Sequence, residues 1–333
     1  MQILVIHPGA LGDIILSLPA LRILRGQFGN ARIILAANTD YAGAVAAGYA
    51  DQILPISSLP LHRLHGSDTI PPEDRLWWRS YDRVVSWTGF GNESFARQLT
   101  QIHPCALVSS WKPDGAERRH VARLFADSLN PWLVPPRTLP LPEIAIDLTS
   151  RQAGDAWLRD QGVGGDQSLY ALHPGAGSTA KRWPSRSFLE LAQRLRILGD
   201  LLIVEGPAET GLGSDLARSV GPGAHLASEL PLRILAAVLS YCRAFVGNDS
   251  GITHLAAGLQ IPCVALFGPS LPEHWAPQGS HVSVLRDADG CIPCSNPREG
   301  SHRCLDNIAV EAVWRQIHMV ADQIKLTPRD MGG

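Results

Sequence analysis

The tetrapeptide His-Pro-Gly-Ala occurs twice in this chain of 333 residues, at 7–10 and again at 173–176. Each copy closes a short apolar run, Ile3–Ile6 in the first case and Leu169–Leu172 in the second, and a helical pattern follows each copy. A buried parallel strand that ends in a tight turn near a ligand has this layout. Two such units, half a chain apart, predict two similar nucleotide-fold domains that face one another across a cleft.

The composition is that of an ordinary soluble protein, with 45% hydrophobic residues, 18% charged residues and a formal net charge of −2. This near-neutral balance disfavours a nucleic-acid-binding protein. No cationic segment of a signal peptide precedes the first apolar run, and no apolar stretch reaches the ~18 residues of a membrane span. We therefore expect a cytoplasmic protein whose six cysteines are mostly reduced.

Short β-rich runs alternate with amphipathic stretches along the whole chain, which is typical of an α/β fold with parallel sheets. The predicted strands are 2–7, 31–36, 52–56, 83–87 and 105–109, then 168–173, 201–205, 244–247, 263–267 and 281–285. The predicted helices include 14–27, 117–129, 184–198, 250–259 and 310–324.

Prolines between residues 131 and 142 interrupt any periodic element and indicate the edge of a domain. We therefore expect an N-terminal domain at 1–148 and a C-terminal domain at 149–308. The last helical segment, 309–333, is of a kind that can pack back on the first domain.

The segment after the first His-Pro-Gly-Ala copy contains Asp13 at the point where a helix begins, just after Gly9 and Gly12. Spacing alone favours an N-cap or first-turn acid that the helix dipole stabilises. The alternative is a carboxylate at the carboxyl end of the first strand, where open α/β sheets bind ligands and where it can act as a general base. The two glycines do not have the spacing of the dinucleotide-binding fingerprint.

The second turn carries the hydroxyl residues Ser178 and Thr179 and the cation Lys181. The N–H and O–H groups of such a loop can surround phosphate oxygens. The alternative is a solvated Lys181–Arg182 pair at a surface turn, and the residues by themselves favour neither interpretation.

A third turn runs from a strand into a helix through Asp249, Ser250 and Gly251, with His254 one helical turn further on. The free N–H groups of a helix N-terminus bind phosphate. An ordinary N-cap followed by a packed histidine is the alternative. Polar groups on three strand-to-helix turns nevertheless favour one shared site.

Cys291-x-x-Cys294, with Cys304 and His302 nearby, has a spacing that zinc ligands can have. A second close pair of ligands is missing from the sequence, so we prefer free or buried thiols and predict no metal site.

In their order along the chain, these motifs resemble glycosyltransferase family 9, the bacterial heptosyltransferases of lipopolysaccharide core assembly. The resemblance spans nearly the whole chain. It rests on Gly12-Asp13 with Pro19-Ala-Leu, Lys181-x-Trp183-Pro184, Gly206-Pro-Ala-Glu209, Asn248-Asp249-Ser250-Gly251-x-x-His254, Phe267-Gly-Pro-Ser270 and the cysteine segment.

The resemblance implies a GT-B fold, with two Rossmann-like domains whose parallel sheets face a central cleft. It implies that the first domain binds the acceptor and the second binds the nucleotide sugar. The implied reaction is an inverting, metal-independent transfer of a heptose from an ADP-activated donor.

The roles of single residues follow from the resemblance by position. Asp13 matches the family's catalytic base, and Lys181 matches the cation that stabilises the departing diphosphate. The remaining donor-site matches are Ser178 and Thr179 for the phosphates, Glu209 for the nucleoside, and Asp249, Ser250, Gly251 and His254 for the nucleotide-sugar loop.

The densest basic cluster of the sequence contains Arg118 and Arg119. Such a cluster is more often a solvated helical face than a site, but the resemblance makes both arginines, with Gly12, weak candidates for contact with an acidic inner-core acceptor. His7 and Pro8 depart from the family pattern, since many members carry a basic residue and a hydroxyl residue there.

We therefore predict a glycosyltransferase without a cofactor that moves a heptose, or a related sugar, from an ADP-sugar to a lipopolysaccharide core acceptor. Because that acceptor is lipid-linked, we expect transient contact with the cytoplasmic face of the inner membrane. The alternatives are a GT-B nucleotide-sugar epimerase and a nucleotide-sugar-binding protein without catalysis.

Overall fold

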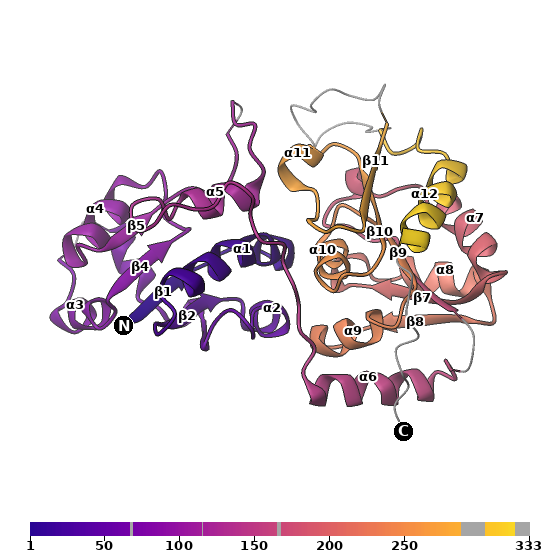
Figure 1. Cartoon of the computed structure of the whole chain (residues 1–333), viewed down its shortest axis with the longest axis horizontal. Coiled ribbons are helices and arrows are strands. Elements are labelled where there is room, and N and C mark those ends of the chain that lie inside the picture. Colours follow the sequence, from indigo (N-terminus) through magenta and orange to yellow (C-terminus); the bar gives the residue numbers. More distant parts are fainter. Residues whose placement is uncertain (67–68, 115, 165–167, 288–303, 324–333) are drawn as a thin grey trace. The chain divides into compact units, whose positions relative to one another are not determined.

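The computed structural model describes residues 1–66, 69–114, 116–164, 168–287 and 304–323 (Figure 1). The chain divides into two compact units, Met1–Ala145 and Ile146–Gly333. Each unit is an α/β domain built on one parallel sheet, as the alternation of apolar and amphipathic segments predicts.

The sheet of the first unit has the strand order β3-β2-β1-β4-β5. Its strands are β1 (Gln2–Ile6), β2 (Arg32–Ala37), β3 (Gln52–Pro55), β4 (Arg83–Ser86) and β5 (Ala106–Val108). Its helices are α1 (Leu11–Gln27), α2 (Thr39–Val45), α3 (Pro72–Arg79), α4 (Glu93–Ile102) and α5 (Val121–Asp127).

The apolar run at the start of the chain forms the central strand of this sheet, and it is buried on both faces. Leu4 and Ile6 pack in one cluster with Trp78 of α3 and Phe95 of α4. Because side chains alternate along a strand, Ile3 and the other odd-numbered residues face the opposite side. Burial on both sides explains why the run is continuously hydrophobic.

The sheet of the second unit has the strand order β11-β10-β9-β6-β7-β8. Its strands are β6 (Ser168–His173), β7 (Gly199–Glu205), β8 (Ala224–Ser228), β9 (Ala244–Asn248), β10 (Cys263–Phe267) and β11 (Val282–Arg286). Its helices are α6 (Leu148–Asp160), α7 (Ser185–Arg196), α8 (Leu212–Val220), α9 (Leu232–Leu239), α10 (Gly251–Gly258), α11 (Pro272–Trp275) and α12 (Val310–Gln323).

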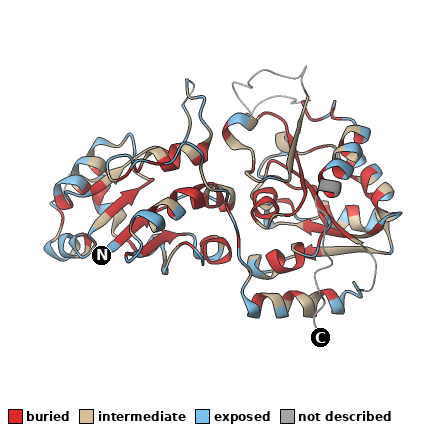
Figure 2. Cartoon of the chain, viewed as in Figure 1, coloured by how far each residue is buried: buried red, intermediate tan, exposed pale blue. Residues whose placement is uncertain are grey.

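The central strands of both sheets are buried, whereas the edge strands β3, β8 and β11 are mostly half-buried (Figure 2). In the second unit α7, α8 and α12 contribute to one apolar cluster on the sheet, while α6 packs against α9. Up to residue 323, the terminal helix α12 thus belongs to the core of the second unit, through Val313, Ile317 and Val320.

Several elements differ from the sequence prediction: α1 begins at Leu11 rather than at residue 14, and β8 and α5 differ for reasons that the structure shows. β8, which the sequence did not predict, is an edge strand that pairs only with β7 among the described strands, so it needs no continuous apolar run. Helix α5 begins at Val121 rather than at residue 117, because the His120 side chain accepts a hydrogen bond from the Ala122 N–H and caps the helix. None of the described helices has both the length and the apolar character required to cross a membrane.

In both sheets the strand that comes first in the chain lies in the middle. The next two strands are added on one side of it, and the remaining strands are added on the other side. In such an open sheet the strand order reverses at a switch point, and ligands bind outside the carboxyl ends of the strands there. The switch point lies between β1 and β4 in the first unit and between β6 and β9 in the second. Each His-Pro-Gly-Ala turn directly follows one of the strands at a switch point.

Candidate functional site

In the first unit, the histidine of the turn is enclosed by aromatic rings. His7 is fully buried, and its ring centroid lies 5.4 Å from that of Trp87 and 5.2 Å from that of Phe125. Burial lowers the pKa of His7 to about 3, so the ring is neutral at pH 7. Its Nδ1 accepts a hydrogen bond from the Gly9 N–H at 3.0 Å, which holds the turn.

Asp13 lies in the first turn of α1. Its Oδ2 accepts a hydrogen bond from the Ala10 N–H at 2.9 Å, so the carboxylate does act as a first-turn helix acid. A Cβ at Gly9 would stand 2.5 Å from the Asp13 Cβ and 2.6 Å from the His7 Cε1. Only glycine at this position therefore allows His7 and Asp13 to approach the turn so closely.

Asp13 also lines a cavity of about 460 Å³ at the carboxyl ends of β1, β4 and β5. Aromatic side chains and the cation Lys112, whose Nζ lies 5.3 Å from the ring centroid of Trp111, share the wall with it. The lining residues are Pro8, Gly9, Ala10, Asp13, Trp87, Thr88, Gly89, Phe90, Ser110, Trp111 and Lys112. The walls thus combine aromatic rings with charged and hydroxyl groups, which suits a polar small molecule.

The weaker acceptor candidates Gly12, Arg118 and Arg119 do not line this cavity. Both arginines are exposed. Arg119 forms ion pairs with Glu117 at 2.6 Å and with Asp127 at 2.8 Å, so acids of the same unit compensate its charge. The cavity cation Lys112 was not a candidate in the sequence, because nothing near it in the chain marks it.

In the second unit, Lys181 and Asp249 come together although 68 residues separate them. Lys181 ends a short 3₁₀ helix, Thr179–Lys181, and its Nζ lies 2.6 Å from Asp249 Oδ2. The Ser270 hydroxyl donates to the same oxygen at 2.5 Å. Asp249 is only 8% exposed, and the buried carboxylate holds the partly exposed cation in place.

The second histidine of the repeat lies in a polar network. His173 Nε2 is 2.9 Å from Glu209 Oε1, and His173 Nδ1 is 3.1 Å from Ser250 Oγ. Burial by itself raises the pKa of Glu209, but the hydrogen bond and charge of His173 and the Gly206 N–H outweigh it and hold that pKa below its usual value.

Asn248, a residue that sequence reasoning did not select, ties the loops of this unit together. It is fully buried at the end of β9. Its Oδ1 accepts from the Trp183 N–H at 2.9 Å, and its Nδ2 donates to the Pro174 carbonyl at 2.9 Å. In the sequence, Asn248 begins the Asn248-Asp249-Ser250-Gly251 motif and closes an apolar strand, but the motif gave it no role of its own.

The other predicted donor residues lie on the same edge of the sheet. Ser178 directly precedes the Thr179–Lys181 turn, and Thr179 is exposed there. Gly251 begins α10, and His254 is buried one turn later. The carboxyl ends of β6, β7, β9 and β10 thus gather these residues.

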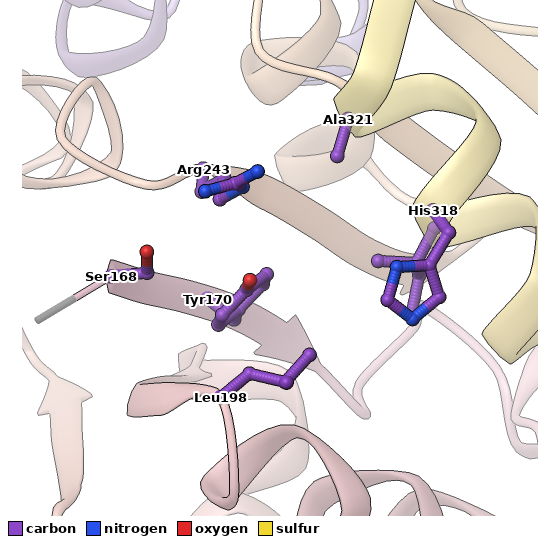
Figure 3. A pocket seen from close by; sticks show the side chains of 7 residues that line it. Ser168, Tyr170, Leu198, Arg243, His318 and Ala321 are labelled. Atoms are coloured by element: carbon purple, nitrogen blue, oxygen red, sulfur yellow. The ribbon is translucent and has the colours of Figure 1, made fainter. Parts of the chain in front are cut away.

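A different cavity, of about 240 Å³, lies near the starts of β6 and β9 (Figure 3). Ser168, Tyr170, Arg243 and His318 are among its lining residues. Ligands of open α/β sheets bind at the carboxyl ends of the strands, so this cavity is at the wrong edge to be the main site.

Most of the candidate zinc ligands lie outside the part of the chain that the structure describes. Cys291, Cys294 and His302 lie outside the described residues, and Cys304 is buried. Among the described residues, no group of three or more His, Cys, Asp and Glu side chains is placed to hold a metal ion.

Comparison with known proteins agrees with the resemblance in the sequence. The model of glycosyltransferase family 9 (heptosyltransferase) matches residues 105–302, which is more than half of the chain. Lipopolysaccharide heptosyltransferase 2 of Salmonella typhimurium is 30% identical over 173 residues, 49% of this chain and 50% of that protein. The chain thus spans about half the length of the first curated relatives that it matches.

Two further likenesses cover most of the chain. Lipopolysaccharide heptosyltransferase 1 of Pseudomonas aeruginosa is 28% identical over 88% of this chain and 86% of that protein. The structure of Escherichia coli ADP-heptose lipopolysaccharide heptosyltransferase II has a TM-score of 0.75 at 21% identity, and the match covers 97% of this chain and 99% of that one. This likeness shows a shared GT-B fold. With the family model matched over more than half of its length, the chain belongs to glycosyltransferase family 9.

Proposed function

We propose that this protein transfers a heptose, or a related sugar, from an ADP-sugar to a lipopolysaccharide core acceptor, with inversion at the anomeric carbon and without a metal. The proposal rests on the different functional groups at the two switch points. A carboxylate lines an aromatic cavity in the first unit, whereas a cation and a helix N-terminus lie together in the second.

The first unit supplies the base for the acceptor. A sugar hydroxyl is a weak nucleophile, so a group must take its proton as the new bond to the anomeric carbon forms. Asp13 is the only carboxylate among the residues lining the cavity of the first unit. Its carboxylate receives that proton, while Trp111 and Lys112 contact the acceptor saccharide.

The second unit binds the donor and stabilises the leaving group. As the bond between the anomeric carbon and the phosphate oxygen breaks, its electron pair stays on ADP, whose charge needs compensation. Lys181 and the first N–H groups of α10 provide it, together with the hydroxyls of Ser178 and Thr179. Glu209 contacts the nucleoside, and the loop of Asp249, Ser250, Gly251 and His254 holds the nucleotide sugar.

The acceptor links this reaction to a membrane surface. A lipopolysaccharide core carries lipid chains, so the enzyme works at the cytoplasmic face of the inner membrane and contacts it transiently. It needs no cofactor besides its donor substrate.

The test begins with donor binding. We expect ADP-sugars to raise the unfolding free energy of the protein by about 2.7 kcal/mol at 100 times their Kd, and UDP-sugars to have no such effect. A response to UDP-sugars alone would overturn the donor assignment.

Product analysis then separates the possible activities. With ADP-heptose and a lipopolysaccharide acceptor, we expect a new glycosidic product of inverted configuration, formed equally well in the presence of EDTA. Turnover of the donor without an acceptor would identify an epimerase instead. Tight donor binding with no turnover in either reaction would identify a binding protein.

A further inference from the structure

His173 has no part in the mechanism proposed above, yet it is a buried polar residue of the donor site. It is 2% exposed and ends β6, next to the Gly247 position of β9. Glu209, on one side, follows β7, and Ser250, on the other, precedes α10. The ring is in hydrogen-bond contact with both, at 2.9 Å and 3.1 Å.

The Glu209 carboxylate assigns one proton of the ring. An ionised carboxylate only accepts hydrogen bonds, so His173 Nε2 donates to Glu209 Oε1. On the other side of the ring, Nδ1 and the Ser250 hydroxyl share a hydrogen bond at 3.1 Å. One imidazole therefore fixes the orientation of an acid and of a hydroxyl that are far apart in the chain.

Each partner is held by a second interaction. The Gly206 N–H donates to Glu209 Oε1 at 3.1 Å. Ser250 Oγ caps α10 by accepting from the Thr253 N–H at 3.4 Å. A Cβ at Gly175 would stand 2.1 Å from Glu209 Oε1, so the glycine of the second turn is what lets the acid approach the loop.

We propose that His173 is a positioning residue that couples the nucleoside end of the donor site, at Glu209, to the diphosphate end, at Ser250 and the start of α10. The coupling rests on the proposed function, which assigns these two ends to one ADP-sugar. The hydrogen bond to Glu209 occupies Oε1 and presents the rest of the carboxylate to the nucleoside. The bond to Ser250 holds its hydroxyl oxygen between the ring and the Thr253 N–H, so the helix N-terminus meets the phosphates through its remaining backbone N–H groups.

The chain offers a graded set of substitutions. His173→Gln places an amide nitrogen near the position of Nε2 and can keep the bond to Glu209. His173→Asn places an amide group, which can accept or donate, near the position of Nδ1 and can keep the bond to Ser250. His173→Leu can form neither bond. Isothermal titration with ADP and steady-state kinetics are measured for each variant, with the melting temperature as a check on folding.

We expect His173→Leu to weaken ADP binding by at least tenfold and also to lower kcat. His173→Asn should weaken ADP binding, and adding Glu209→Gln should weaken it little further, because the substitution has already released that acid. His173→Gln should lower kcat with a small change in ADP affinity, and adding Ser250→Ala should change kcat little further. If His173 had only a structural role, ADP affinity and kcat would fall together and to the same extent in all three variants. If His173→Leu does not fold, the Asn and Gln variants carry the test.

Losses that simply add in both double variants would overturn the coupling. Failure of the wild-type protein to bind ADP is a separate outcome, because it would overturn the proposed function itself. A wild-type enzyme that binds ADP and transfers sugar, with additive double variants, would leave the proposed function standing and remove only the role of His173.

Discussion

The two His-Pro-Gly-Ala turns share a sequence and a place in the sheet, but their histidines lie in opposite surroundings. His7 is surrounded by Trp87, Trp111 and Phe125, and burial holds its pKa far below the usual value. His173 lies between the acid Glu209 and the hydroxyl of Ser250. The tetrapeptide thus sets the path of the backbone, while the neighbouring strand and loops decide what the histidine does.

The glycines of the two turns show what the repeat has in common. A Cβ at Gly9 would collide with Asp13, and a Cβ at Gly175 would collide with Glu209, at 2.5 Å and 2.1 Å respectively. In both units the glycine makes room for a carboxylate beside the turn. That carboxylate lies four residues after Gly9 in the first unit, but it comes from the end of the next strand in the second.

The largest expected effect concerns the carboxylate of the first turn. Asp13→Asn should lower kcat by about 10²- to 10⁴-fold, the usual contribution of a general base. The Kd for ADP should not change, because the proposed donor residues all belong to the second unit. Single-turnover transfer and isothermal titration measure the two quantities.

Asp40→Asn is the matched control for this substitution. Asp40 is also an acid in the first turn of a helix of the first unit, but it does not line the cavity. If Asp13 serves only the helix dipole, both variants will lose about 0.3–1 kcal/mol of stability and neither will lose transfer.

The cations of the two units should also behave differently. Lys181→Met removes the charge next to Asp249 and should lower kcat by about 10²- to 10³-fold while weakening ADP binding, because the leaving diphosphate loses a charged donor. Lys112→Met, in the cavity of the first unit, should raise the KM for the acceptor and leave ADP binding unchanged. An effect of Lys112→Met on ADP affinity would contradict the proposal that the first unit binds the acceptor and the second unit binds the donor.

Alanine substitutions at Gly9 and Gly175 test whether the missing side chain is needed for the close approach of Asp13 and Glu209. Gly9→Ala should displace Asp13 and lower kcat, whereas Gly175→Ala should displace Glu209 and weaken ADP binding. Each is an overpacked site, for which about 1–3 kcal/mol is typical. Gly177→Ala is the control in the second loop, since a Cβ there meets nothing within 4 Å. Normal turnover of Gly9→Ala, or normal ADP affinity of Gly175→Ala, would contradict the inference that each glycine makes room for a functional carboxylate.

The fold was open to prediction from the sequence because most of its strands are continuous apolar runs buried on both faces. The runs at Ile3–Ile6 and Leu169–Leu172 mark the central strand of each sheet. β8 escaped prediction because an edge strand with His225 and Ser228 lacks that pattern. The cap at His120 likewise depends on one side-chain hydrogen bond that periodicity does not reveal.

The candidate site was open to prediction only in part. Asp13, Lys181 and Asp249 lie in the segments that come after β1, β6 and β9, so the topology brings them to the carboxyl edge of a sheet. The contacts of His173 join residues 36 and 77 positions away, and no local pattern encodes them. The charge of Arg119 was visible in the sequence, but its compensation by Asp127 depends on how α5 folds.

An effect on stability alone, with none expected on donor binding, comes from the aromatic surroundings of His7. Its pKa is about 3 in the folded protein against 6.5 for the ordinary ring, so the unfolded chain binds more protons between these two values. Stability from the neutral ring is therefore complete above pH 6.5 and is lost as the pH falls toward 3. Between pH 7 and pH 5 this single group should account for about 2 kcal/mol of unfolding free energy.

His7→Asn isolates that contribution, because the amide oxygen can still accept from the Gly9 N–H but does not titrate. At pH 7 the variant should be less stable than the wild type, since it leaves a cavity among the aromatic rings. At pH 5 the deficit should shrink by about 2 kcal/mol, because only the wild type must keep a histidine neutral. Urea unfolding at the two pH values measures the difference, and a deficit that stays constant would mean that His7 is not held neutral by its aromatic surroundings.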